Sequence, residues 1–330
     1  FYLFDKRPNF YNKKFVKEFG VPRKPDTQLT QRHIQLAGAL QRAFEKIVFH
    51  LLYIVKKDGT KSDNLVLAGG AAMNCVFNGL LDKKKIFKNN FIPPWPDDLG
   101  VTIGALYLAN QRFNKKKIKP KRLRSAYLGP SFKDKEIVDT LNKFKLNYKK
   151  PNNLNEFVAK KLASKKLVGW FQGKMEFTHR SLGNRSILAD PRGKSIKDII
   201  NKAVKYRETF RPFAPAVLEE DAYKIFDVAK DTKVDFMEKV VEVKREWRKK
   251  IPAITHVDNT ARLQTVSKSY NLNFYNLIEE FKKQTGVPVL VNTSFNLNGQ
   301  PIVLSPSDAI KTFYSCGLDI LVIGSYIIEK

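Results

Sequence analysis

Apolar residues recur along this chain in short stretches with the spacing of helices and strands. Between residues 30 and 55 they recur every three or four positions, which predicts an amphipathic helix that Thr30 caps. Helices are also predicted at 71–81, 100–112, 134–144, 154–164, 196–204 and 306–315. Short apolar runs predict strands at 65–68, 88–92, 167–171 and 287–292, and a strand pair at 318–328. Because strands alternate with helices, we expect an α/β or α+β fold.

One segment, residues 173–192, shows neither the helical nor the strand period. It carries Arg180, Arg185 and Arg192 together with glycines. The planar guanidinium group suits bidentate binding of phosphate or carboxylate, and glycine lets backbone N–H groups approach a ligand closely. The pattern predicts an anion-binding loop.

The alternative for this loop is an internal ion network, since Glu176 and Asp190 lie within it. Lys205, Arg207 and Arg211 follow soon after and add three more cations. Positive charge then exceeds the local carboxylates, which favours a ligand with several negative charges.

A second motif joins the strand predicted at 65–68 to the next helix through Gly69-Gly70, with Asn74 soon after. Such a turn places backbone N–H groups at the positive end of a helix and suits a nucleotide or phosphate, but tight packing also explains it. Asp98 precedes the helix predicted at 100–112. A carboxylate there is either a helix cap or a metal ligand, and with no neighbouring His the residue pattern favours the cap.

Polar residues alternate from His256 to Gln264 and include Thr260 and Arg262. This period of two predicts one strand face covered with hydrogen-bonding groups, either exposed to solvent or forming the wall of a site. Residues 291–296 place further hydroxyl and amide groups after a buried strand, where both substrate sites and turns are common.

Composition fits a soluble globular protein of two domains: 330 residues, 43% hydrophobic, mean hydropathy −0.36. A basic stretch without apolar period, residues 114–126, is the predicted boundary, which gives domains 1–125 and 126–330. No apolar run approaches the ~20 residues that cross a bilayer. Cys75 and Cys316 are too few for a disulfide framework, so we expect a cytoplasmic protein. The start lacks an initiator Met and a signal pattern, and we expect preceding residues to be absent.

The net charge of +28 has two interpretations. It attracts nucleic acid, a membrane or anionic substrates, or it reflects a lysine-rich proteome. The lysines lie in scattered runs without the interleaved aromatic residues of a single-strand binding groove, which favours the second interpretation.

Several of these motifs, in order, give the chain a family resemblance. Residues 68–75, 96–105, 173–192, 205–215, 256–264 and 292–296 are together similar to the nodulation- and antibiotic-type O-carbamoyltransferases. The resemblance extends from about residue 22 onward. It implies that residues 1–125 are the C-terminal portion of an ASKHA (actin/Hsp70-like) transfer domain whose N-terminal part is missing. It implies a YrdC-like domain at 126–330.

The resemblance also implies an activity. Carbamoyl phosphate and ATP, with Mg²⁺, would give carbamoyl adenylate in the YrdC-like domain, and the carbamoyl group would pass to a hydroxyl of a small-molecule or glycan acceptor. A divalent metal, Fe²⁺ in the family, would be held in the transfer domain by two His and by Asp98. We expect no nucleic-acid or membrane partner, and a homodimer is compatible with this assignment.

The family's Lys-x-Arg and Ser-x-Asn elements fall on Lys205, Arg207, Ser294 and Asn296. The first pair would bind phosphates and the carbamoyl oxygen, and the second would orient the adenylate.

The other anion contacts of the family match Arg180, Arg185 and Arg211, and His256, Thr260 and Arg262 would form a substrate wall. Two departures stand out. None of the chain's four histidines occupies the family's metal motif, and Thr178-His179 replaces the usual Gly-Pro.

Two other functions compete with this one. A tRNA threonylcarbamoyladenosine-type enzyme would share both domain folds, and the positive charge would suit tRNA. A non-catalytic nucleic-acid-binding protein would depend on the lysine excess and would not use carbamoyl phosphate. The order of the domains and the segment from Arg180 to Arg185 favour the O-carbamoyltransferase.

Overall fold

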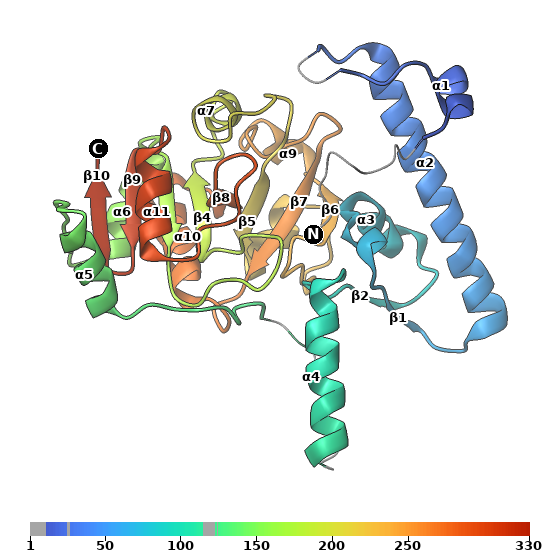
Figure 1. Cartoon of the computed structure of the whole chain (residues 1–330), viewed down its shortest axis with the longest axis horizontal. Helices are drawn as coiled ribbons and strands as arrows, with labels where there is room; N and C mark the ends of the chain where they lie inside the picture. The colour runs from blue at the N-terminus through green and yellow to red at the C-terminus, as the bar shows by residue number, and fades with distance from the viewer. Residues whose placement is uncertain (1–10, 25–26, 115–122, 124) are drawn as a thin grey trace. The chain divides into compact units, whose positions relative to one another are not determined.

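The computed structural model describes residues 11–24, 27–114, 123 and 125–330 (Figure 1). The chain folds into two units, residues 1–62 and 63–330. The boundary predicted at 114–126 falls mainly on residues outside the described ones, and it stays a prediction.

The first unit contains α1 (Lys13–Phe19) and the long helix α2 (Gln31–Ile54), which ends in a π-helical turn (Val55–Gly59). The predicted helix at 30–55 is confirmed. Thr30 caps it as expected, because His33 Nδ1 accepts a hydrogen bond from the Thr30 backbone N–H at 3.0 Å.

The second unit is built on a large mixed sheet of eight strands, in the order β10-β9-β3-β4-β8-β5-β7-β6. Its strands are β3 (Val168–Phe171), β4 (Arg185–Ala189), β5 (Ala214–Leu218), β6 (Lys239–Glu242), β7 (Thr260–Val266), β8 (Val289–Ser294), β9 (Ile320–Ile323) and β10 (Tyr326–Glu329). β3 with β9 and β5 with β7 are parallel pairs, and the other pairs are antiparallel. A separate parallel pair joins β1 (Asn64–Val66) to β2 (Asn89–Phe91).

Helices cover this sheet, and the central strands are buried along their length as in other α/β sheets. The α-helices of the unit are α3 (Cys75–Lys84), α4 (Leu99–Asn114), α5 (Asp134–Lys143), α6 (Leu154–Ala163), α7 (Ile196–Ala203), α8 (Ala222–Ile225), α9 (Arg245–Arg248), α10 (Leu272–Thr285) and α11 (Pro306–Tyr314). Two 3-10 turns lie at Gly70–Met73 and Glu219–Asp221. The expected mixed α/β class is confirmed. No described helix is long and apolar enough to span a membrane.

The predicted elements agree with the structure except in two places. The segment 173–192 is not wholly a loop, because its second part forms β4, a strand so buried that it lacks the alternation of a half-exposed one. The helix predicted at 71–81 begins as a 3-10 turn, and α3 starts only at Cys75, where the side chain of Asn74 caps it. The sequence reasoning did not identify the strands β5 and β6 or the helices α1, α8, α9 and α10.

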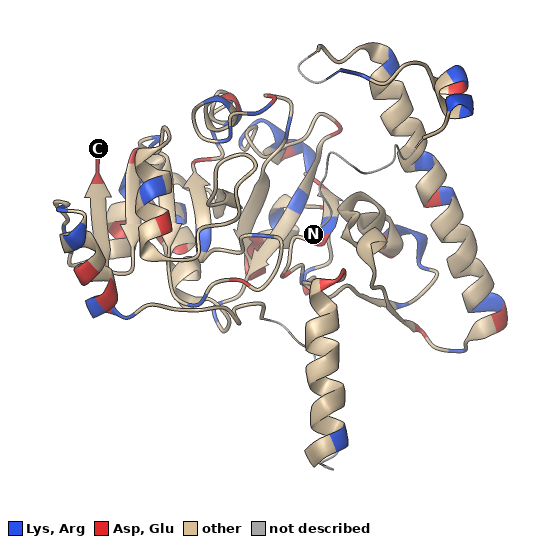
Figure 2. Cartoon of the chain, viewed as in Figure 1, with Lys and Arg blue, Asp and Glu red and all other residues tan. Residues whose placement is uncertain are grey.

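Lysine and arginine are spread over most helices, among them α2, α5 and α11 (Figure 2). The positive charge is therefore not concentrated on one described element, as the scattered lysine runs suggested.

Helix α3 packs tightly against β6, and this contact brings the start of α3 to the large sheet. Asn78 is buried and its Nδ2 donates to the carbonyls of Ala72 and Glu238. Gly79 faces the strand so closely that an added Cβ would lie 1.9 Å from the Val240 carbonyl oxygen. The position therefore admits only glycine without movement of α3.

Replacing Gly79 with Ala should lower the free energy of unfolding by about 1–3 kcal/mol or more, because α3 has to move away from β6. Gly104→Ala in α4 is the matched control, since no atom lies within 4 Å of its added Cβ. That change should raise stability by roughly 0.5–1 kcal/mol. Urea unfolding measures both, and equal midpoints for the two variants would contradict the α3–β6 contact.

Candidate functional site

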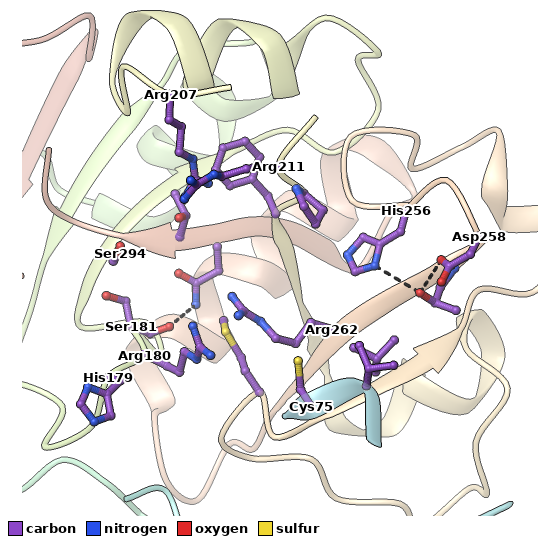
Figure 3. A pocket seen from close by; sticks show the side chains of 18 residues that line it. Cys75, His179, Arg180, Ser181, Arg207, Arg211, His256, Asp258, Arg262 and Ser294 are labelled. Atoms are coloured by element: carbon purple, nitrogen blue, oxygen red, sulfur yellow. Dashed lines mark hydrogen bonds between the residues drawn. The ribbon is translucent and has the colours of Figure 1, made fainter. Parts of the chain in front are cut away.

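A cavity of about 390 Å³ opens beside β7 and β8 within the unit 63–330 (Figure 3). Side chains line it from the start of α3, from the segments before β4, β5 and β6, from the turn before β7, and from the strands β6, β7 and β8. They are Cys75, Val76, His179, Arg180, Ser181, Arg207, Arg211, Pro212, Phe213, Met237, Val240, His256, Asp258, Thr260, Arg262, Asn292, Thr293 and Ser294.

Four of these lining residues are arginines, and only Asp258 carries a carboxylate. Arg211 Nε pairs with Glu208 Oε2 at 2.9 Å, while Arg207 donates from Nε to Asn201 Oδ1 at 2.8 Å and lies over the Phe213 ring. Arg180 forms no hydrogen bond or ion pair with any described residue. Its guanidinium points toward that of Arg262 in Figure 3, across the cavity floor.

The positive charges of the cavity arginines lower one another's pKa, because each guanidinium group destabilises the protonated form of its neighbours. Burial, and then the charges of Arg180 and Arg207, lower the pKa of Arg262 to about 10, although the Cys75 thiol opposes this. Burial and Arg211 likewise lower the pKa of Arg207. A bound anion would relieve both effects, because opposite charge favours the ionised form.

The strand face predicted from alternation is confirmed in part. Thr260 and Arg262 belong to β7 and line the cavity, whereas His256 and Asp258 belong to the turn that precedes the strand. Thr260 Oγ1 lies 3.1 Å from His256 Nδ1 and donates to Asp258 Oδ1 at 2.6 Å. Burial lowers the pKa of His256, which favours the neutral imidazole, and its Nε2 is buried without a partner among the described residues.

Of the residues expected to bind the anion, the structure brings Arg180, Arg207, Arg211 and Ser294 to the cavity wall, but not Lys205. Lys205 is buried, and its Nζ contacts four oxygens: the carbonyls of Ser294 and Asn296 at 2.5 and 2.9 Å, Ser294 Oγ at 3.1 Å and Asn296 Oδ1 at 2.7 Å. Lys205 thus holds the turn after β8, and Asn296 is its partner there rather than a lining residue.

Arg185 also lies outside the cavity, which corrects the expectation that it faces an anion. Its side chain is fully buried and donates to the carbonyls of Gln172 (2.5 Å), Asn184 (3.1 Å), Pro130 (3.3 Å) and Gly173 (3.2 Å). The guanidinium stacks on Phe171, 3.6 Å from the ring centroid. The hydrogen-bond acceptors of the Arg185 guanidinium are therefore backbone carbonyls of its own segment and of Pro130, not a bound anion.

The residues of the Gly-Gly motif and Asp98 are not among the cavity-lining residues either, although Cys75, which follows Asn74, is. The Gly69 N–H already donates to the Pro96 carbonyl at 2.5 Å, and Asn74 Oδ1 accepts from Phe77 N as a helix cap. Asp98 is exposed at the start of α4. No group of three His, Cys, Asp or Glu that could hold a metal occurs in the described part of the chain. Asp98 therefore does not form a metal site with described residues alone.

His179 and Ser181 lie in the predicted anion-binding segment, and Cys75 and Asn292 lie in the motifs at 68–75 and 291–296, but sequence reasoning gave none of these four lining residues a role of its own. His179 stands where the resemblance is least typical, and its Nε2 lies 2.7 Å from Asp97 Oδ2. Thr178 Oγ1 donates to the Pro94 carbonyl at 2.5 Å. These two contacts join the arginine segment to the residues before α4, which explains the unusual Thr178-His179 pair.

Comparison with known proteins identifies the family. The family model for the carbamoyltransferase C-terminus matches residues 159–330, and the model for the carbamoyltransferase N-terminus matches residues 2–107. The chain belongs to the carbamoyltransferase family. The predicted resemblance is confirmed at this level.

Curated relatives of this chain include two nodulation proteins. Nodulation protein NolO of Bradyrhizobium diazoefficiens is 42% identical over 96% of this chain and 57% of its own length. Nodulation protein NolNO of Sinorhizobium fredii is 42% identical over 96% of this chain and 46% of its own. An uncharacterized protein of Synechocystis is 40% identical over 97% and 56%, respectively. The chain spans about half the length of these relatives.

Lys205 should make the stability of the protein depend on pH. Burial and the charge of Arg207 lower its pKa from 10.5 to about 7, although the Cys316 thiol opposes this. Between these pH values the unfolded chain binds the proton more tightly, so stability rises with pH. The difference in unfolding free energy between the unmodified protein and Lys205→Met should rise from pH 7 to 10, by at most about 1.4 kcal/mol per pH unit. Urea unfolding at each pH measures it, and a constant difference would contradict the lowered pKa.

Proposed function

We propose that this carbamoyltransferase forms carbamoyl adenylate in the arginine-lined cavity and then passes the carbamoyl group to a hydroxyl of a small-molecule or glycan acceptor. Carbamoyl phosphate first loses inorganic phosphate to water and leaves carbamate. A carbamate oxygen then attacks the α-phosphorus of ATP, and the bond to pyrophosphate breaks. Carbamoyl phosphate, ATP and water thus give carbamoyl adenylate, pyrophosphate and phosphate. In the transfer step the hydroxyl oxygen of the acceptor attacks the carbamoyl carbon, the bond from this carbon to the AMP oxygen breaks, and AMP leaves with the carbamate ester as product.

One observation carries this proposal: four arginines converge on a cavity whose lining includes a single carboxylate. Both substrates are polyanions that repel each other, and a site that joins them has to neutralise and align them. Arg180 has no partner among the described residues and its charge is available for a phosphate. Arg207 and Arg211 extend the positive wall on the side of Ser294 (Figure 3).

The remaining lining residues fit roles around the charged centre. Neutral His256 and Thr260 supply hydrogen-bonding groups without adding charge, and Phe213 gives an apolar surface below Arg207. Lys205 acts on the site through Ser294, whose carbonyl it holds. We assign it to positioning rather than to direct contact with phosphate.

Arg180→Gln should lower carbamoyl-phosphate-dependent exchange between ATP and pyrophosphate on the order of 10²- to 10³-fold, because the variant loses a cation placed for the developing negative charge. It should leave the midpoint of urea unfolding almost unchanged, since Arg180 makes no hydrogen bond or ion pair with the described residues.

The matched control is Arg192→Gln, a change in the same segment but away from the cavity. Arg192 pairs with buried Asp190 at 2.7 Å, so its loss should lower stability on the order of 2 kcal/mol while exchange persists. Exchange that is absent from the unmodified protein, or that survives in Arg180→Gln, would contradict the proposal.

A further inference from the structure

Two oxygen atoms on the cavity wall are buried and have no hydrogen-bond partner among the described residues: Asn292 Oδ1 and Ser181 Oγ. The exposed fractions of the two residues are 0% and 2%. Buried polar atoms are normally paired, so an unpaired pair in a cavity indicates a ligand that supplies the missing partners.

The orientation of the Asn292 amide is fixed by its neighbours. Its Nδ2 donates to the Ser181 carbonyl at 3.1 Å, the bond dashed at Ser181 in Figure 3, and to Gln264 Oε1 at 2.8 Å. Gln264 is itself fixed, because its Nε2 donates to the Leu182 carbonyl at 2.8 Å. If the Asn292 amide were flipped, its oxygen would face two other acceptor oxygens, the Ser181 carbonyl and Gln264 Oε1, with no hydrogen between them. The observed orientation is therefore fixed, and Oδ1 is available only as an acceptor.

The two oxygens also sit on a rigid base. Asn292 lies in β8, where its backbone pairs with Leu188 of β4 on one side and Ala214 of β5 on the other. Ser181 is tied to the same side chain through its carbonyl. Groups held by a central strand keep their positions when a ligand changes, which suits them to discrimination.

We infer that Asn292 Oδ1 and Ser181 Oγ accept hydrogen bonds from the NH₂ group of the carbamoyl unit and thereby select carbamoyl phosphate against other acyl phosphates; this rests on the proposed function. A carbamoyl NH₂ offers two N–H donors in one plane, one for each oxygen. The methyl group of acetyl phosphate has nearly the same size but no donor, and it would leave both oxygens unpaired.

The adenine amino group is the competing donor. Ser181 directly follows Arg180, and Asn292 lines the same cavity as Arg262. The base of a nucleotide prefers apolar faces to guanidinium groups that also have to hold phosphate. The apolar ring of the cavity, Phe213, lies with Arg207 instead. The position among cations fits the small reacting group.

The experiment compares kcat/KM for exchange between ATP and pyrophosphate with carbamoyl phosphate and with acetyl phosphate. The unmodified protein should prefer carbamoyl phosphate on the order of 10²-fold or more. Asn292→Leu should reduce this preference at least tenfold, roughly the loss of one paired hydrogen bond. Ser181→Ala should reduce it by less, since an acceptor remains. Ser181→Ala also removes an unpartnered hydroxyl and preserves the fold.

Ser164→Ala is the matched control and should keep the full preference, because Ser164 follows the last residue of α6 and does not line the cavity. Equal use of both acyl phosphates by the unmodified protein overturns the inference even if Asn292→Leu does not fold. The inference is also overturned if Ser181→Ala keeps the full preference for carbamoyl phosphate over acetyl phosphate. It is overturned as well if the variants change the preference for ATP over GTP instead of the preference between the two acyl phosphates. In all three cases carbamoyl-phosphate-dependent exchange persists, whereas failure of the proposed function removes that exchange and the inference with it.

Discussion

The buried Glu176–Arg185 pair determines the shape of the segment on which the whole site depends. Glu176 Oε1 accepts from the backbone N–H groups of Leu182, Asn184 and Arg185 at 2.7, 2.8 and 3.3 Å, while the Arg185 guanidinium donates to carbonyls on the other side of the same turn. The Glu176 carboxylate accepts from backbone N–H groups and the Arg185 guanidinium donates to backbone carbonyls, so these backbone groups of the buried turn are paired. Glu176 Oε2 and Arg185 Nε themselves have no partner among the described residues. Burial raises the pKa of Glu176, which its backbone donors oppose. Arg180 and Ser181 reach the cavity because this pair holds the residues on either side of them.

A consequence is that the cavity is unfavourable when its cations are unpaired. Acidic groups near the segment are already engaged, Glu176 by backbone donors and Asp190 by Arg192. The cavity arginines lower one another's pKa, so a polyanion that binds there gains both its own contacts and the relief of this repulsion. Anion binding therefore stabilises the fold as well as the complex, by mass action. The +28 net charge contributes little to this, since it comes mainly from lysines spread over the helices.

Much of the fold was predictable from the sequence, because periodic apolar residues set helices such as α2 and α6 and short apolar runs set β3 and β8. The site was predictable only in outline. Density of arginine indicated an anion site, but it could not separate Arg180, which faces the cavity, from Arg185, which is buried five residues later. The two arginines differ because Arg185 belongs to the buried strand β4 and its backbone N–H pairs with Glu176. These are tertiary contacts, and the local sequence pattern does not indicate them. Asn292 lay within the predicted motif 291–296, but its role was not predictable for the same reason: it depends on Gln264 and Ser181, which are distant in sequence.

The loops and the sheet contribute different properties to the proposed site, because charged groups and fixed hydrogen-bond acceptors distinguish ligands to different degrees. A guanidinium group binds phosphate wherever it occurs, so the arginines favour any acyl phosphate and any nucleotide alike. Discrimination between acyl phosphates needs a neutral hydrogen-bond acceptor whose orientation is fixed. A ligand without a donor leaves such an acceptor unpaired and therefore binds less well. Asn292 satisfies both conditions: its side chain is tied at Nδ2 by two acceptors and its backbone is held between β4 and β5. In the proposed site, arginines such as Arg180 thus supply affinity through their charge, and Asn292 Oδ1 together with Ser181 Oγ supplies the choice of substrate.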